Sequence, residues 1–288
     1  MNPAIGTVAP ISMEVRLDKR TVLAGQVWCA ERPRALIAIV HGLGEHAGRY
    51  AALASDLARA RFTVAAFDLP GHGDTGGPRG DIPSWLHVRD HAIPAMFTAS
   101  RGMPGQPTNL PHVLLGHSMG GVMALDHAIA HPRDLSALVV SAPALKSVPP
   151  PWWKLTLAQV ARVATPTAGF PNGLPVEALS RDPEVVKAYR DDPRVHNRIS
   201  PRLYFAFEEA RHRVMQDARR LAVPTLVFQG MADRVVDPKG TLEFTSACPH
   251  GMVRFETLVE TYHELFNDLG REAVVKHLVA WLDAALVV

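Results

Sequence analysis

The chain has 288 residues, of which 47% are hydrophobic and 20% charged, an ordinary balance for a globular protein with a buried core. The formal net charge is only +2, which gives no reason to expect nucleic acid as a partner. The two cysteines, Cys29 and Cys248, are too few for a disulfide framework and lack zinc-ligand spacing.

Neither a secretory signal nor a membrane span is predicted. Residues 1–8 have no basic segment and no sustained apolar run, and no later stretch has the roughly 18 uncharged apolar residues that a span requires. We therefore expect a cytoplasmic protein that is at most peripheral to a membrane. No metal is expected either, because the best histidine pair, His41 and His46, flanks glycines in a loop-like segment.

Strand-like and helix-like patterns alternate through the first half of the chain. The predicted strands are a hairpin at 13–17 and 21–28, then 35–40, 63–67, 112–115 and 135–140. The predicted helices are 50–60, 83–100, which Pro94 must kink or break, and 122–130. Such alternation indicates a parallel sheet with helices on both faces.

The alternation stops after Ser141. Residues 145–220 are helical and irregular in pattern and rich in proline, whereas strands return at 224–229 and 252–256 before a final helix at about 263–285. We expect one α/β core, made of residues 1–144 and 221–288, into which a helical cap of residues 145–220 is inserted.

A Gly116-x-Ser118-x-Gly120 pattern lies between an apolar strand and a helix-like run. On such a sharp turn the serine takes a strained conformation, and small neighbours let the strand and helix approach. Ser118 would then present its hydroxyl at the carboxyl end of a sheet. The pattern predicts a serine nucleophile.

A serine nucleophile needs a base and an orienting acid, which in this order of elements follow it as acid and then histidine. Asp233 follows the strand at 224–229, whereas Asp237, the alternative, precedes a proline and reads better as a helix cap. His263 follows the last strand, whereas His250 precedes it. We predict Asp233 and His263 as the partners of Ser118.

The oxyanion of the reaction also needs hydrogen-bond donors. The backbone N–H of Met119, next after the nucleophile, is one candidate. The other is the N–H of Leu43, in the glycine-rich segment His41-Gly-Leu-Gly44 after the strand at 35–40. No cofactor is needed for this chemistry.

Several of these segments together resemble the monoacylglycerol lipase group of the α/β-hydrolase superfamily. They are His41-Gly-Leu-Gly-Glu-His-Ala-Gly-Arg-Tyr50, Asp68-Leu-Pro-Gly-His-Gly73, Gly116-His-Ser-Met-Gly120, Ala232-Asp233, Tyr262-His263-Glu264 and the proline-bounded segment 180–193. The resemblance covers about residues 35–282. It implies the α/β-hydrolase fold, a mostly parallel eight-stranded sheet with a helical cap, and a small lipid ester as substrate.

The resemblance also implies that Glu45, Arg49 and the cap residue Tyr189 lie near the glycerol end of the site. A buried diol needs polar partners of this kind. The alternatives are that Glu45 and Arg49 pair with each other, or that Arg49 packs against the start of the following helix.

Two adjacent tryptophans, Trp152 and Trp153, begin a helix-like segment with apolar residues at 155, 157, 160, 161 and 163. This segment is expected to line an acyl-chain tunnel or to pack on the core. Tryptophan also favours the boundary between water and lipid, so contact of the cap with a membrane or micelle is predicted.

The favoured function is hydrolysis of monoacylglycerols through an acyl-enzyme. A lysophospholipase or a short-chain carboxylesterase of the same fold is the main alternative, with Arg211, His212 and Arg213 as arguable phosphate ligands. Acyl transfer, peptide hydrolysis and lipid binding without catalysis are less favoured. A peptidase would need carboxylates for a free amino terminus, and a binder has no need of a strained turn.

Overall fold

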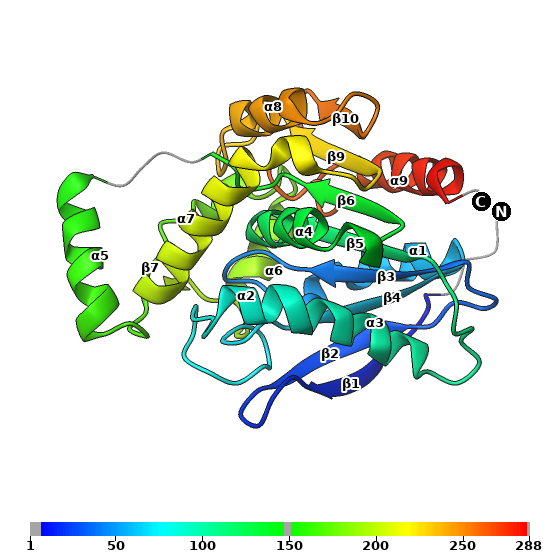
Figure 1. The fold of residues 1–288 in the computed structure, drawn as a ribbon, viewed down its shortest axis with the longest axis horizontal. Helices are drawn as coiled ribbons and strands as arrows, with labels where there is room; N and C mark the ends of the chain where they lie inside the picture. The colour runs from blue at the N-terminus through cyan, green and yellow to red at the C-terminus, as the bar shows by residue number, and fades with distance from the viewer. Residues whose placement is uncertain (1–6, 147–150, 287–288) are drawn as a thin grey trace.

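The computed structural model describes residues 7–146 and 151–286, so part of the predicted cap, residues 147–150, lies outside the described residues. An eight-stranded sheet forms the centre of the molecule (Figure 1), with strands in the order β1-β2-β4-β3-β5-β6-β9-β10. The strands are β1 (Ile11–Arg16), β2 (Val22–Trp28), β3 (Ala35–Val40), β4 (Phe62–Phe67), β5 (His112–His117), β6 (Ala137–Ser141), β9 (Thr225–Gly230) and β10 (Val253–Leu258). From β4 to β10 all neighbours are parallel, and β2 joins antiparallel to β4.

The central strands are buried on both faces, as their continuous apolar sequences predict. Along β3, Leu36, Ala38 and Val40 belong to one hydrophobic cluster, and Ile37 and Ile39 belong to the other. Helices α1 (Ala51–Arg59) and α9 (Arg271–Ala285) contribute to the second cluster. The helices that contribute to the first cluster are α3 (Ile93–Arg101), α4 (Met119–Ala130), α7 (Pro201–Gln216) and α8 (Pro238–Ala247).

The predicted helix at 83–100 is one continuous helical segment with a π-helical turn just before Pro94. It consists of α2 (Trp85–His87), a π-helical turn (Val88–Ala92) and α3, in which Pro94 lies in the first turn. The backbone at His87, Ala92 and Ile93 stays α-helical, so the π-helical turn accommodates Pro94, which has no N–H to donate, without ending the helix.

The final helix begins at Arg271, not near 263 as predicted. The preceding loop turns around the Asp268 carboxylate, which accepts hydrogen bonds from the N–H groups of Tyr262 and Leu269. Gly270, with φ 82°, then starts the helix. His263 is consequently a loop residue.

The chain between β6 and β9 forms α5 (Trp152–Ala164), β7 (Phe170–Pro171), α6 (Pro183–Asp191), β8 (Arg198–Ile199) and α7. The part around α6 is tied to the core: His46 Nε2 lies 2.9 Å from Asp192 Oδ2, and Arg181 Nε lies 3.0 Å from Asp268 Oδ2. Helix α5 instead stands at the far left of the molecule, beside α7 (Figure 1). None of its residues is buried. Within the described ranges, no helix has the length and apolarity needed to cross a membrane.

Candidate active site

Ser118 occupies the sharp turn between β5 and α4. Its φ of 54° and ψ of −118° are rare for a residue other than glycine. The turn is held from outside, because the Ser118 N–H donates to the Ser141 carbonyl at 3.0 Å and its carbonyl accepts from the Ala144 N–H at 3.1 Å. The surrounding strand ends thus maintain a strained backbone at the carboxyl edge of the sheet.

Two glycines allow α4 to approach the ends of β5 and β3 around Ser118. A Cβ atom on Gly116 would lie 2.4 Å from the Gly120 carbonyl oxygen. One on Gly120 would lie 2.2 Å from the carbonyl oxygen of Val40. Backbone atoms at such distances would have to move, so the glycines of the motif are required by packing at this turn.

Asp233 and His263 come from two loops that pack directly on each other. Asp233 follows β9, whose last residue, Gly230, would place a Cβ 2.3 Å from the carbonyl oxygen of Thr261. This close approach puts His263 Nδ1 2.8 Å from Asp233 Oδ2. A carboxylate can only accept, so Nδ1 carries the proton and Nε2 is left with a lone pair.

The Asp233 carboxylate is fixed on its other side as well. Its Oδ1 accepts from the N–H groups of Val235 at 2.8 Å and Val236 at 3.1 Å, and Gln229 Nε2 donates to Oδ2 at 3.2 Å. Burial disfavours the charged form of His263, but the adjacent Asp233 outweighs this effect and raises the pKa of His263 above its ordinary 6.5. The pair is thus arranged to accept a proton at Nε2.

The predicted oxyanion donors lie on either side of Ser118. A Cβ on Gly42 would lie 3.3 Å from Ser118 Cβ, so the loop that carries Leu43 packs against the serine. Met119 is the first residue of α4, where N–H groups have no acceptor within the helix. The His263 ring lies 4.7 Å from the ring of His117, the residue before Ser118. The loop that carries Leu43 and the loop that carries His263 therefore both pack against the carboxyl end of β5, where Ser118 lies.

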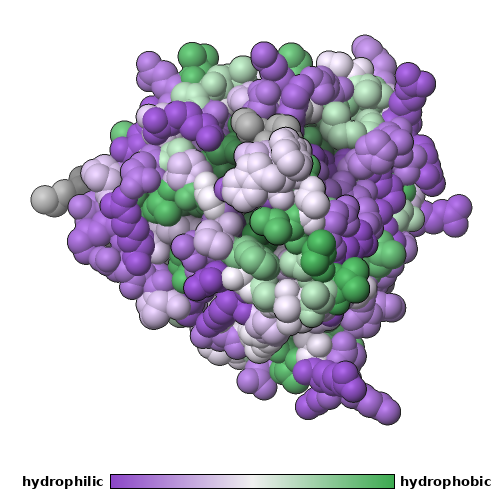
Figure 2. Space-filling view, turned by 90° about the vertical axis from the view of Figure 1, so that its left-hand side faces the viewer, coloured by the Kyte–Doolittle hydropathy of each residue, from purple (hydrophilic) through white to green (hydrophobic). Residues whose placement is uncertain are grey.

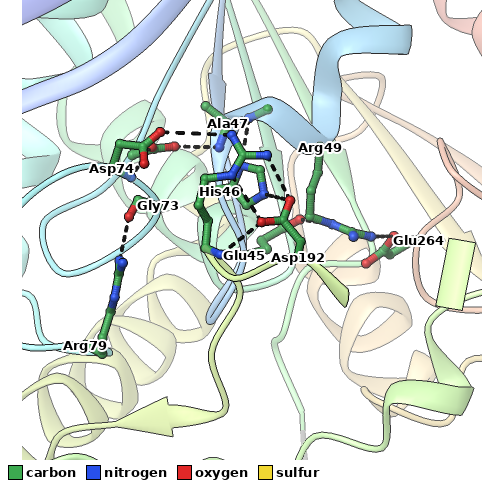
Figure 3. Close-up of polar contacts among 12 residues, drawn as sticks. Glu45, His46, Ala47, Arg49, Gly73, Asp74, Arg79, Asp192 and Glu264 are labelled. Atoms are coloured by element: carbon green, nitrogen blue, oxygen red, sulfur yellow. Dashed lines mark hydrogen bonds and ion pairs between the residues drawn. The ribbon is translucent and has the colours of Figure 1, made fainter. Parts of the chain in front are cut away.

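Glu45 and Arg49 pair with each other, which is one of the alternatives raised by the sequence. Arg49 Nε lies 3.2 Å from Glu45 Oε2 (Figure 3). Glu45 Oε1 also accepts from the Gly42 N–H at 2.6 Å and from the Tyr50 hydroxyl at 2.7 Å. Burial would raise the pKa of Glu45, but nearby His117 and Arg49 lower it to about 2.

Two further side chains complete the surroundings of Arg49. Its Nη2 forms an ion pair with Glu264 (Figure 3), and its guanidinium lies 4.6 Å from the ring centroid of Tyr189 on α6. Tyr189 thus lies over Arg49. Arg49 therefore uses its Nε and Nη2 groups within the protein.

Trp152 and Trp153 lie on α5, away from this cluster, and are 78% and 49% exposed. The apolar residues expected on one face of this helix are divided: Leu155 and Ala161 are half-buried, whereas Leu157, Val160 and Val163 are exposed. Helix α5 contacts α7 through Arg162, which pairs with Glu209 at 3.0 Å.

Sequence reasoning missed two residues of the site. Gln229, the penultimate residue of β9, holds Asp233 while its own Oε1 accepts from Thr241 at 2.7 Å. Glu264 was noted only as a part of the motif around His263, and its partner Arg49 is 215 positions away. Asp237, the rejected acid, caps α8 by accepting from the Lys239 N–H at 3.0 Å, which confirms its predicted role.

Among residues 7–146 and 151–286, no group of three or more His, Cys, Asp or Glu side chains is arranged to hold a metal ion.

Comparisons with known proteins agree with this geometry. Residues 31–270 match the family model Hydrolase_4, described as "Serine aminopeptidase, S33". The chain is 33% identical over 271 residues to a monoacylglycerol lipase of Mycolicibacterium smegmatis, covering 90% of this chain and 92% of that protein. It is 30% identical over 260 residues to phospholipase YtpA of Bacillus subtilis, covering 89% and 98% of the two chains.

A solved structure of the monoacylglycerol lipase from Paleococcus ferrophilus superimposes with a TM-score of 0.81 at 33% identity, over 91% of this chain and 99% of that chain. The eight-stranded, mostly parallel sheet and the hydrolase chemistry predicted from the sequence are both confirmed by these relatives. The chain belongs to the monoacylglycerol lipase group of the α/β-hydrolase superfamily.

Proposed function

We propose that this protein hydrolyses monoacylglycerols to a fatty acid and glycerol through an acyl-enzyme on Ser118. The observation that carries the proposal is the 2.8 Å hydrogen bond between His263 Nδ1 and Asp233, formed beside a serine in a strained turn. Monoacylglycerol lipases among the relatives, at about one-third identity over most of the chain, support the substrate.

The mechanism follows from the positions of the side chains. His263 Nε2 accepts the Ser118 proton while Ser118 Oγ attacks the ester carbonyl. The N–H groups of Leu43 and Met119 stabilise the oxyanion of the tetrahedral intermediate. When the intermediate collapses, the C–O bond to glycerol breaks and His263 protonates the leaving oxygen. Water, deprotonated by His263, then releases the fatty acid and restores Ser118.

The glycerol end of the substrate is proposed to lie near Glu45, Arg49 and Tyr189. Of these, Glu45 and Arg49 already satisfy each other, so the tyrosine hydroxyl and the outer edge of the guanidinium are the groups proposed to meet the diol. A free hydroxyl of the substrate buried here requires a partner, because an unpaired buried polar group is costly.

The lysophospholipase alternative is the next candidate, because phospholipase YtpA is a relative of comparable identity. The two arginines among its proposed phosphate ligands are, however, engaged elsewhere. Arg213 pairs with Asp126 at 2.7 Å, and Arg211 pairs with Glu208. Peptide hydrolysis, suggested by the family description, would need free carboxylates near Ser118, and Glu45 and Glu264 are both bound to Arg49.

A matched substrate panel tests the proposal: a monoacylglycerol, a di- and a triacylglycerol, a lysophospholipid and a short p-nitrophenyl ester. The monoacylglycerol is expected to have the highest kcat/KM of the lipid substrates. A higher value for the lysophospholipid would assign the enzyme to the alternative class. Turnover of the p-nitrophenyl ester alone would retain the serine chemistry and contradict the lipase assignment.

The pH dependence of the reaction should report the ionisation of His263. The residue acts as a base only when neutral, so kcat/KM is expected to fall as the pH is lowered through its pKa. Because Asp233 raises that pKa, the midpoint of the acidic limb should lie above pH 6.5. A pH–rate profile with the soluble p-nitrophenyl ester measures it, and a midpoint well below 6.5 would contradict the role given to His263.

We further propose that α5 contacts the lipid surface from which the substrate comes. Figure 2 shows the side of the molecule on which α5 lies, where apolar residues gather on the surface. Besides the two tryptophans, α5 exposes Leu157, Val160 and Val163 at 62%, 63% and 85%. A helix that exposes so much apolar surface is typical of an interaction site, and tryptophan favours the lipid–water boundary.

Replacing Trp152 and Trp153 together with alanine is expected to lower activity on micellar monoacylglycerol while leaving hydrolysis of a soluble short ester nearly unchanged. The reason is that α5 lies away from Ser118 and would act only through adsorption. The control is Leu242→Ala, an exposed apolar residue on α8 (54% exposed), which should affect neither substrate. Equal losses on both substrates would contradict a role at the lipid surface.

A further inference from the structure

Glu264 is a buried carboxylate whose position the hydrolytic mechanism leaves unexplained. It directly follows His263, is only 4% exposed, and pairs with Arg49 while accepting from Asn267 Nδ2 at 3.1 Å. Its backbone N–H donates to the carbonyl of Leu179, at the base of the cap, at 2.8 Å. The residue thus joins the histidine loop to two other parts of the molecule.

Through Arg49, Glu264 is connected to the oxyanion loop on the other side of Ser118. Arg49 binds Glu45, and Glu45 accepts from the N–H of Gly42, which is adjacent to Leu43. Figure 3 shows Arg49 extending from Glu45 towards Glu264. The two loops that flank the nucleophile are therefore linked by a continuous series of charged contacts, with Tyr189 of the cap stacked on the arginine.

The charges of this cluster do not balance. Two carboxylates, Glu45 and Glu264, share one guanidinium, and all three side chains are less than 10% exposed. Burying a charge without a full counter-charge is costly. One of the two carboxylates belongs to the residue directly after His263, the group that becomes positively charged when it takes the serine proton. Four side chains face or influence that imidazole: Asp233, His117, Glu45 and Glu264.

We propose that Glu264 is a positioning residue that ties the histidine loop to the oxyanion loop through Arg49. It also supplies excess negative charge that favours the imidazolium form of His263. This inference rests on the proposed function. Burial and the neighbouring Glu45 raise the pKa of Glu264 itself, and its contacts with Arg49 and Asn267 oppose this rise. Both Glu264 and Glu45 contribute to the raised pKa of His263. This assignment makes Arg49 mainly a bridge between the loops and secondarily a ligand of glycerol.

The charge imbalance separates this role from a purely structural one. In Glu264→Gln, Arg49 keeps Glu45 as a partner, so the buried cluster becomes neutral and an amide still accepts a hydrogen bond. We therefore expect no decrease in Tm, whereas activity falls. An ordinary structural ion pair behaves in the opposite way, because removal of one partner leaves a buried charge uncompensated and destabilises the fold.

The experiment compares wild type, Glu264→Gln, Glu264→Asp, Arg49→Lys and the control Glu260→Gln, whose side chain lies in the same loop but is 88% exposed. For each variant, kcat and KM are measured on a monoacylglycerol and on p-nitrophenyl butyrate, which has no glycerol, together with Tm and the pH profile. Glu264→Gln should lower kcat on both esters by about 10- to 10²-fold with little change in KM. The midpoint of the acidic limb of its pH–rate profile should move to a lower pH by about 0.5–1 unit.

The other variants distinguish charge from geometry. Glu264→Asp keeps the charge on a shorter side chain, so its acidic limb should remain near that of wild type while kcat falls. Arg49→Lys cannot bridge two carboxylates as a guanidinium does, so it should lower kcat on both esters. Glu260→Gln should match wild type in every measurement.

Three results would overturn the proposal. They are an unchanged rate and pH limb in Glu264→Gln, a Tm several degrees lower in that variant, and an Arg49→Lys defect confined to the KM for monoacylglycerol. Failure of the proposed function would look different. Wild type would then cleave p-nitrophenyl butyrate but not monoacylglycerol, and the butyrate kinetics would still decide the role of Glu264.

Discussion

Replacing Ser118 with alanine should lower kcat by about 10⁶-fold, the size of the loss when the nucleophile of a comparable triad is removed. Without Oγ there is no acyl-enzyme, and His263 has no hydroxyl proton to accept. The residual rate would come from binding and the oxyanion donors alone. Hydrolysis of p-nitrophenyl butyrate, measured at high enzyme concentration, is sensitive enough to detect the low residual rate of the variant.

The same position offers a control on folding. Ser118 holds φ at 54°, which costs of order 1–3 kcal/mol for a residue with a Cβ and much less for glycine. Ser118→Gly should therefore be as inactive as Ser118→Ala but unfold at a higher Tm. An alanine variant that retained substantial activity would contradict the assignment of Ser118 as the nucleophile. A glycine variant with a lower Tm than the alanine variant would contradict the inference that the backbone at residue 118 is strained.

Replacing Asp233 with asparagine should lower kcat by about 10⁴-fold, although the fold is retained. The asparagine Oδ1 can still accept from the N–H groups of Val235 and Val236. Its NH₂ group would then face His263 Nδ1, which must become an acceptor. The imidazole proton would move to Nε2, where the neutral ring can no longer receive the Ser118 proton.

Asp237→Asn is the matched control, four residues further along the chain. Asp237 caps α8, and asparagine caps a helix about as well as aspartate. This variant should therefore retain both activity and stability. If Asp237→Asn were inactive and Asp233→Asn active, Asp237 would be the acid of the triad and Asp233 would not.

The parallel core and the positions of Ser118, Asp233 and His263 at its carboxyl edge could be predicted because each depends on local pattern. Continuous apolar runs such as 35–40 indicate strands buried on both faces, and residues that follow such strands share one edge of the sheet. The glycines at 116 and 120 indicate directly that backbone segments approach each other closely at this turn. The Asp237 cap is equally local, since its acceptor group lies two residues from its donor.

The features that could not be predicted depend on contacts between distant segments. The final helix starts at Arg271 because Asp268 organises the loop before it, and periodicity alone does not show this. Arg49 meets Glu264 across 215 positions, so the sequence left open whether Arg49 faced substrate or Glu45. The exposure of α5 depends on where the whole cap is placed.

The most direct test of the account is to label the wild-type enzyme with a long-chain alkyl fluorophosphonate and map the adduct by mass spectrometry. The serine oxygen forms a bond to phosphorus while fluoride leaves and His263 takes the proton. We predict a single adduct on Ser118, formed more slowly in the presence of monoacylglycerol than of lysophospholipid. An adduct on another residue, or no protection by monoacylglycerol, would contradict the account.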